Sequence, residues 1–170
     1  MPRKTAMTIM MEQLEATTFT TPSDREIRIT RIVDAPAGRI FDAWTNTEHL
    51  PNWMLGPGGG WTMPVCEIDL RPGGAWRFGW RNTDGDEMSI AGVYREIRSP
   101  RRLVSSESWG EDWPETINTL ELAETNGATR ITLTILYPTQ DARDDALQTG
   151  MKRGIAVSYN RLAEYLKASA

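Results

Sequence analysis

Glu107 is the acidic side chain that the sequence most directly turns towards the interior of the protein. Alternate residues of the run RLVSSESW share one face of an expected strand, namely Leu103, Ser105, Glu107 and Trp109. Leu103 must face the core for this strand to join it, so Glu107 faces inward as well. A carboxyl group held beside Trp109 and away from water has a raised pKa, and it can act as a general base or as a ligand anchor. The competing interpretation places Glu107 at a strand end, in water or paired with an arginine.

His49 is the only histidine, and therefore the only side chain whose ordinary pKa lies near neutrality. On a helix that runs into Leu50 and Pro51, it would either supply an acid or base at the mouth of a cavity or lie at the surface near the helix end. A zinc or iron site is not expected, because Cys66 is the only cysteine and no carboxylates stand at a recognisable ligand spacing. We also expect no organic cofactor, since the glycine-rich runs at 56–60 and 71–74 lack the Gly-Lys-Ser/Thr of a phosphate-binding loop.

The stretch from His49 to Trp80 contains four of the seven tryptophans and two glycine-rich turns. Large aromatic side chains beside tight turns predict apolar surface arranged around a change of chain direction. We therefore predict a cavity for an apolar or aromatic small molecule. For Trp76 and Phe78, in the middle of a strand, we prefer plain core as the interpretation. The expected apolar lining is Trp53, Met54, Trp61, Trp80, Trp109, Met151 and Ile155, and the polar groups expected to orient a ligand are Ser105, Glu107 and Asn118.

The elements that must position these residues begin with a strand and two short helices. Residues Glu26–Val33 alternate between apolar and polar side chains, which predicts a half-buried strand. A helix follows with Pro36 in its first turn, and Thr47 is placed to cap a second short helix that ends at Trp53. These two helices would bring His49 and Trp53 to the start of the glycine-rich region.

About six antiparallel strands and one long helix complete the expected fold. Asp84-Gly85 and Asn126-Gly127 each separate two alternating runs, which is typical of hairpins. From Thr139 to Lys167, apolar residues recur every three or four positions and predict a single helix, although Gly150 and Gly154 weaken it. A strongly bent sheet that grips the terminal helix would bury one face of each, which makes the fold class α+β.

Length and composition fit one domain, which we place at residues 23–170 behind a flexible segment of residues 1–22. That segment includes a short helical or extended piece around Ile9 to Leu14. A chain of 170 residues with 39% hydrophobic residues can bury a substantial core, and its net charge of −4 argues against nucleic acid as a partner. No apolar run reaches membrane-spanning length and the start lacks a signal core, so we expect no membrane insertion. The single cysteine suits a reducing cytoplasm.

Three runs of the sequence carry a family resemblance. They are FTTPSDREIRITRIVDAPAGRIFDAWTNTEHLPNWMLGPGG, VCEIDLRPGGAWRFGW and GVYREIRSPRRLV. Together they resemble the family of activator-of-heat-shock-protein-ATPase homologues, which lies in the helix-grip superfamily with START domains and the birch-pollen allergen. The resemblance covers roughly Phe19 to Leu166. It implies a helix-grip fold in which a long C-terminal helix packs in the concave face of a curved antiparallel sheet, over a cavity.

Two departures from the pattern of that family affect the expected cavity. Many relatives carry Trp-Trp before Gly-Pro, whereas this chain has Trp53-Met54-Leu55. Many also carry Gly-Trp in the last helix, where this chain has Gly154-Ile155. Since smaller and more flexible side chains replace large aromatic ones, the ligand of a relative cannot be transferred to this chain.

Three functions fit these observations. The first is the binding of an apolar or aromatic small molecule between the sheet and the C-terminal helix. The second is an enzyme of the cyclase or hydrolase kind, in which Glu107 or His49 transfers a proton. The third is a co-chaperone-like interaction domain, which only the family resemblance implies. A symmetric homodimer is a further hypothesis.

Overall fold

The computed structural model describes residues 2–8 and 16–169, so the short piece expected around Ile9 to Leu14 lies outside the described residues. Within them, eight strands form one antiparallel sheet in the order β1-β2-β8-β7-β6-β5-β4-β3. The strands are β1 (Thr18–Thr20), β2 (Glu26–Val33), β3 (Thr62–Ile68), β4 (Ala75–Arg81), β5 (Glu87–Arg98), β6 (Arg102–Glu107), β7 (Thr116–Thr125) and β8 (Ala128–Leu136).

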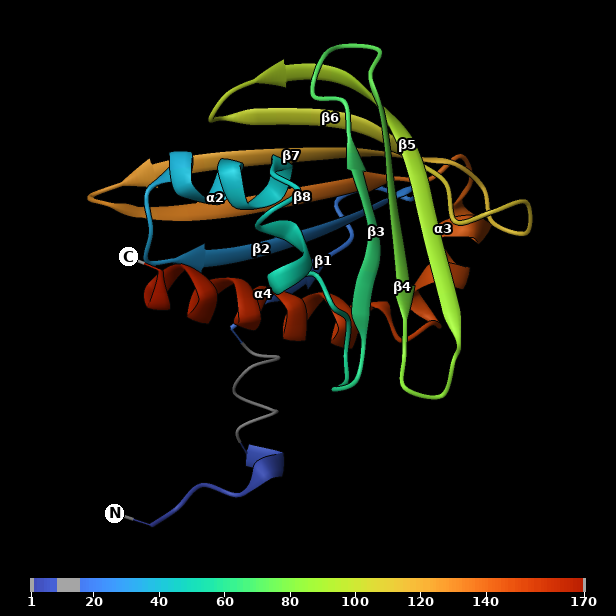
Figure 1. The fold of residues 1–170 in the computed structure, drawn as a ribbon. Coiled ribbons are helices and arrows are strands. Elements are labelled where there is room, and N and C mark those ends of the chain that lie inside the picture. The colour runs from blue at the N-terminus through green and yellow to red at the C-terminus, as the bar shows by residue number, and fades with distance from the viewer. Residues whose placement is uncertain (1, 9–15, 170) are drawn as a thin grey trace.

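The helices lie on the concave side of this sheet (Figure 1). Helix α2 (Ala37–Thr45) and the 3-10 turn η1 (Leu50–Asn52) connect β2 to β3, and α3 (Gln140–Leu147) and α4 (Met151–Ala168) follow β8. Helix α4 contacts α2 and η1, and η1 also contacts β3. In Figure 1, β2, β8, β7 and β6 run across the view, whereas β5, β4 and β3 run steeply down towards α4. This is a sheet bent around a C-terminal helix, and the predicted helix-grip fold is confirmed.

The core fills the space between the inner face of the sheet and the helices. On β2, Ile27 and Ile29 are fully buried, and they lie opposite Ile135 and Leu133 of β8. The alternating pattern of β2 therefore predicted its buried face correctly. Helix α2 adds Ile40 and Phe41, and the inward face of α4 adds Tyr159, Leu162 and Leu166.

Three details differ from the sequence prediction. The single helix expected from Thr139 to Lys167 is wrong, because the chain forms α3 and α4 with a break at residues 148–150. The Thr139 hydroxyl accepts a hydrogen bond from the Ala142 amide at 3.1 Å and so caps α3, while Gly150 is the N-cap of α4. The second short helix expected from Thr47 to Trp53 is only the 3-10 turn η1.

The sheet also begins earlier than expected, inside the segment of residues 1–22. Strand β1 pairs with β2, and Phe19 lies opposite Ile29. Thr17 is buried, and its hydroxyl accepts a hydrogen bond from Arg31 Nη1 at 3.2 Å. Three residues are too few for a recognisable alternation, so the sequence pattern did not indicate this edge strand.

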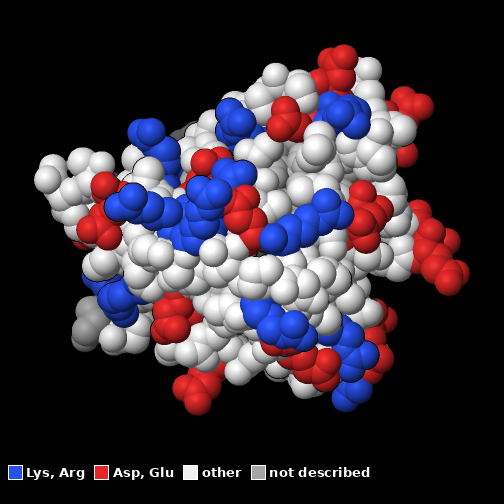
Figure 2. Space-filling view, turned by 90° about the horizontal axis from the view of Figure 1, so that it is seen from above, with Lys and Arg blue, Asp and Glu red and all other residues white. Residues whose placement is uncertain are grey.

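Charged side chains of both signs alternate over the outside of β5, β6 and β7. Arg98 and Arg102 both pair with Glu96, and Arg102 also pairs with Glu121. Figure 2 views the molecule from above Figure 1 and shows basic and acidic side chains interspersed over this face. Such a mixed surface gives an anionic polymer no continuous basic strip on the face that is seen.

The close approach at Gly92 shapes the bend in the sheet. Gly92 of β5 lies opposite Trp76 of β4. A Cβ atom at Gly92 would overlap the backbone carbonyl of Ser106 and lie 2.6 Å from the indole of Trp76. Only a residue without a side chain allows Trp76 and Ser106 to come this near to the strand.

We expect Gly92→Ala to lower the free energy of unfolding by about 3 kcal/mol or more, since the methyl group meets backbone as well as side-chain atoms. Denaturation with urea measures this change. The matched control is Gly58→Ala, where an added Cβ has nothing within 4 Å, and we expect a change below about 0.5 kcal/mol. Equal stability of the two variants would show that the contact at Gly92 is not a constraint.

Candidate functional site

A row of inward residues crosses the bend in the sheet and carries the chemistry of the candidate site. Trp76 of β4 lies opposite Gly92 of β5. Tyr94 pairs with Ser105, and an isolated bridge joins Ala91 to Ser108, which places Gly92 opposite Glu107 of β6. Glu107 in turn lies opposite Thr116 of β7, and Ser105 lies opposite Asn118. Ser105 and Glu107 therefore lie on one face of β6, and Asn118 of β7 lies beside them.

Glu107 accepts two hydrogen bonds from neighbouring side chains. Trp109 Nε1 donates to Oε1 at 2.7 Å, and Asn118 Nδ2 donates to Oε2 at 2.8 Å. The Thr116 hydroxyl donates to Asn118 Oδ1 at 2.9 Å, which turns the amide so that its NH₂ group faces Glu107. We call these four residues the Glu107 cluster. None of the ion pairs between described residues includes Glu107, so its charge has no basic partner among them.

Burial raises the pKa of Glu107, while the hydrogen bonds from Trp109 and Asn118 lower it and offset only part of that rise. Although Glu107 as a residue is only partly buried, its carboxyl group is surrounded closely enough by protein to lose much of its hydration. Burial also raises the pKa of Tyr137 to about 12, and the negative charge of Glu107 adds to this rise. The same two causes raise the pKa of Tyr159 on α4. Glu107 therefore lies within electrostatic reach of tyrosines from both the sheet and the helix.

Three buried polar atoms of the described side chains have no hydrogen-bond partner: Trp76 Nε1, the Tyr159 hydroxyl and Asn160 Nδ2. Each such group destabilises the fold by about 1–3 kcal/mol, because it has left water and gained nothing in return. Asn160 is partly compensated, since its Oδ1 accepts a hydrogen bond from Arg31 Nη1 at 2.5 Å. Trp76 and Tyr159 have no such compensation, although Trp76 is only 5% exposed and Tyr159 only 3%.

The residues of the predicted apolar lining do not all lie in the same surroundings. Trp80 stacks on Trp109 with ring centroids 6.3 Å apart, and its Nε1 donates to the Met54 carbonyl at 2.7 Å. Trp53 instead is fully buried, packs against Trp44 and donates to the Ala43 carbonyl, so it belongs to the core. Four further side chains of the predicted lining are partly buried and pack against the core: Met54, Trp61, Met151 and Ile155. We call these four residues and Trp109 the mouth group.

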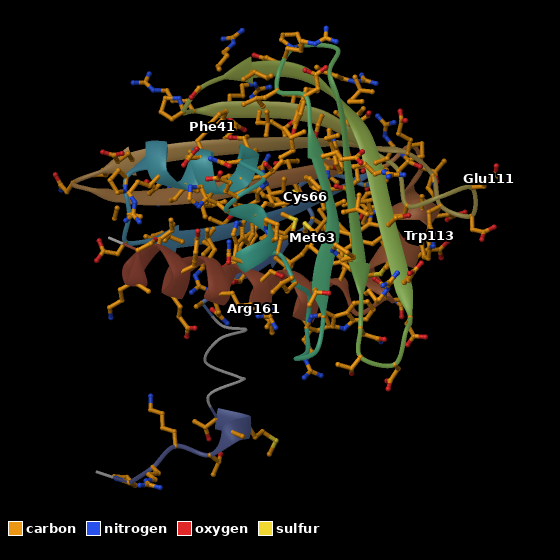
Figure 3. The ribbon with its side chains drawn as sticks, viewed as in Figure 1. Phe41, Met63, Cys66, Glu111, Trp113 and Arg161 are labelled. Atoms are coloured by element: carbon orange, nitrogen blue, oxygen red, sulfur yellow. The ribbon has the colours of Figure 1, made fainter. Side chains whose placement is uncertain are left out.

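The glycine-rich loop at 56–60 is fastened to α4. Arg161 donates to the carbonyls of Gly56 and Gly58, and the Gly56 amide donates to the Ser158 hydroxyl at 3.1 Å. Figure 3 shows Arg161 on α4, on the side of the helix where this loop lies. An added Cβ at Gly154 would lie 3.6 Å from Pro57, which is an ordinary contact. The structure therefore has room for a Cβ atom at Gly154, and packing against this loop does not by itself require glycine in the first turn of α4.

His49 lies apart from the Glu107 cluster, near the C-terminal end of α4. Its Nδ1 is 2.7 Å from the Tyr165 hydroxyl, and its Nε2 is 3.1 Å from Asp42 Oδ2. Arg39 donates to the Leu166 carbonyl at 2.9 Å and to the Ser169 hydroxyl at 3.0 Å beside it. His49 therefore joins α2 to α4 at the surface, where it is 35% exposed.

Two pockets of the described part of the chain lie at the surface. One, of about 220 Å³, contains His49, Arg39 and Tyr165. The other, of about 330 Å³, lies over β3, β4 and β5 and contains Arg77, Gly79 and Glu87. Neither contains Glu107 or Tyr159, so the predicted cavity between the sheet and α4 is not one of them. Within the same residues, no three His, Cys, Asp or Glu side chains are grouped to hold a metal ion.

Sequence reasoning missed the residues whose role depends on contacts between distant segments. Trp76 was assigned to plain core, and nothing in its strand indicates that its indole N–H has no acceptor. Tyr159 lies on the apolar stripe of the last helix, so only its hydroxyl distinguished it from Leu162. Arg161 on the same helix resembles an ordinary solvated arginine until the glycine-rich loop is placed beside it.

These features define a helix-grip protein: a bent antiparallel sheet with a long C-terminal helix across its concave face. The sequence agrees, because residues 34–167 match the family described as Activator of Hsp90 ATPase homolog 1-like protein. The chain belongs to this family. No match was found among curated proteins.

Several solved structures share the fold. A protein from Rhodobacter sphaeroides has 27% identity and a TM-score of 0.85, with 90% of this chain and 99% of that chain covered. A protein from Nitrosomonas europaea has 22% identity and a TM-score of 0.77, with 88% and 98% covered. An "AHSA1-like protein" from Aeromonas hydrophila has 16% identity and a TM-score of 0.62, with 84% and 93% covered. These last two likenesses concern the fold alone.

The fastening of the glycine-rich loop gives a first prediction for the site. We expect Arg161→Met to speed hydrogen exchange in residues 54–61 about tenfold, because two hydrogen bonds from a charged donor are lost. Mass spectrometry of the peptide that covers these residues measures the rate. Arg153→Met, which removes an exposed arginine from the same helix, should leave it unchanged. Unchanged exchange in Arg161→Met would show that the loop is held by other contacts.

The raised pKa of Glu107 gives a second prediction. Glu107 binds a proton more tightly in the folded protein than in the unfolded protein. Ionisation of this group therefore lowers the free energy of unfolding as the pH rises above 4.5, its ordinary pKa. Glu107→Gln removes this loss. We therefore expect the melting temperature of the variant, relative to the parent, to increase between pH 4.5 and pH 8. Glu111→Gln removes the same charge from an exposed loop position, seen at the edge of the molecule in Figure 3, and should show no such trend.

Proposed function

We propose that this protein binds an apolar or aromatic small molecule between the inner face of the sheet and α4. The observation that carries the proposal is a pair of buried polar atoms without partners, Trp76 Nε1 and the Tyr159 hydroxyl. Proteins rarely leave buried donors without acceptors, because the loss is not recovered elsewhere. A bound molecule that supplies acceptors would recover it.

The mouth group is the proposed entrance. Met54 and Met151 are unbranched and flexible, so they can be displaced by a small ligand at modest cost. Trp109 is 43% exposed and stacks on Trp80, which offers an aromatic surface at the edge of the interior. Affinity would come from burial of the ligand at about 25 cal/mol per Å² of apolar surface, less the cost of moving these side chains.

Proton transfer by Glu107 is the second candidate function. The specific observation is a carboxyl group whose pKa burial raises and which neighbouring side chains hold in a fixed position. Such a group can accept or donate a proton, as a general acid or base does. His49 does not share this site, since its partners are Asp42 and Tyr165 at the surface.

Location and partners are proposed on weaker grounds. Cys66 is a free, partly buried thiol on β3, which suits a reducing compartment such as the cytoplasm. Among the described helices, none has the length and apolar character needed to cross a bilayer. A chaperone partner, as the family description suggests, and a homodimer both stay hypotheses.

The identity of the ligand is tested by extracting the purified protein with organic solvent and analysing the extract by mass spectrometry. We expect one apolar compound enriched over an extract of the Ile155→Trp variant. Relatives carry tryptophan at this position, so the variant should fold, and its side chain would occupy space in the mouth group. Identical extracts from the two proteins would contradict retention of a ligand at this site.

Direct binding is tested with tetralin, a bicyclic hydrocarbon that has no polar group. We expect saturable binding in an NMR titration, with the methyl resonances of Met54 and Met151 shifted, and at least tenfold weaker binding to Ile155→Trp because the indole fills the site. Met88→Trp adds the same side chain at a position that is 41% exposed, and it should bind as the parent does. Absence of saturable binding to the parent by tetralin and also by its ketone, 1-tetralone, would reject the proposed function.

A further inference from the structure

The indole N–H of Trp76 is a buried hydrogen-bond donor that has no acceptor. An indole N–H can only donate a hydrogen bond, so its missing partner must be an acceptor. The ring cannot turn to seek one, because it lies against Gly92, with its atoms 2.6–2.7 Å from the position of an added Cβ, and its centroid is 4.8 Å from that of Phe78. The direction of the N–H bond is therefore fixed by packing.

Tyr159 brings a second fixed donor from the opposite side. Its ring lies against Trp44 at 5.5 Å and Trp53 at 6.4 Å, so aromatic packing positions the hydroxyl. The hydroxyl has no partner, and the residue is 3% exposed. Burial, and after it the charge of Glu107, raises the pKa of Tyr159, so this hydroxyl keeps its proton and can donate a hydrogen bond.

The Glu107 cluster restricts the charge and the hydrogen-bonding groups that a ligand can carry. Both carboxyl oxygens already accept hydrogen bonds, from Trp109 and Asn118, and Asn118 is held in that orientation by Thr116. Burial favours the neutral acid, and a neutral carboxyl group is one more donor that needs an acceptor. An anionic ligand would be repelled whenever Glu107 is ionised. A cationic amine would leave the Trp76 N–H without an acceptor.

We infer that Trp76 and Tyr159 are ligand-binding residues and that they recognise an acceptor oxygen of a neutral, largely apolar carbonyl compound, such as an aromatic ketone. This inference rests on the proposed function and names its ligand class. Trp76 is then no plain core residue, but the donor that selects the ligand.

The test compares three compounds with one bicyclic frame: tetralin, 1-tetralone and the cationic 1-aminotetralin. We expect the parent protein to bind 1-tetralone at least tenfold more tightly than tetralin or the amine. Trp76→Phe and Tyr159→Phe should each weaken 1-tetralone binding about three- to tenfold relative to tetralin binding, since each removes one donor. Tyr159→Phe keeps the ring and should leave tetralin binding itself unchanged, whereas Trp76→Phe also exchanges the indole for a smaller phenyl ring, so that variant is judged by the ratio of the two affinities. Trp113→Phe changes an exposed tryptophan and should alter neither.

A spectroscopic readout keeps the test decisive if a variant fails to fold. In the parent protein, the Trp76 indole N–H resonance should move downfield with 1-tetralone and not with tetralin, because only the ketone offers an acceptor. Equal affinities for tetralin and 1-tetralone, with no such shift, would overturn the inference and leave the proposed function standing. Tightest binding of 1-aminotetralin would overturn it in favour of a cation held by ionised Glu107. No binding of any of the three compounds would reject both.

Discussion

The close approach of Ser106 and Trp76 to β5 at Gly92 is the constraint on which the rest of the structure depends. The first half of β5 pairs with β4, from Glu87 to Val93, and its second half pairs with β6, from Tyr94 onward. At the change of partner, the absence of a side chain lets the Ser106 carbonyl and the Trp76 indole approach the strand. The bend therefore turns two groups of strands towards one another and directs both inner faces at α4.

The candidate site exists because residues from the two groups of strands meet at this bend. The β4 side supplies Trp76 and Trp80, and the β6–β7 side supplies Glu107 and Asn118. Trp109 joins the two sides, since it stacks on Trp80 and donates to Glu107. Burial at this junction raises the pKa of the Glu107 carboxyl group, and the same packing leaves the Trp76 indole N–H without a protein acceptor.

Sequence pattern was sufficient for the fold because the alternation of each long strand fixes which side chains face inward. Register then follows from the hairpin turns, and so the shared face of Ser105 and Glu107 was predictable. The site was predictable only in part, because the missing facts concern contacts between distant segments. In the sequence, Trp53 and Trp80 are both tryptophans near glycine-rich turns. The 3-10 turn η1 nevertheless places the Trp53 side chain in the core. The break between α3 and α4 was not predicted either, because apolar residues continue at helical spacing across it, from Leu147 to Met151.

The two departures from the family pattern now have a structural meaning. At position 54 it is the backbone carbonyl that accepts the hydrogen bond from Trp80, so exchange of the side chain does not break that contact. The loop beyond it is held through the carbonyls of Gly56 and Gly58 by Arg161, again independently of the side chain at position 54. Ile155 likewise makes no polar contact that its replacement would remove from the interior. Side chains at positions 54 and 155 can therefore change the size of the entrance while the bend, the loop and the Glu107 cluster stay in place. Such a separation would allow the size of the proposed entrance to change while the interior donors of this chain, Trp76 and Tyr159, stay as they are.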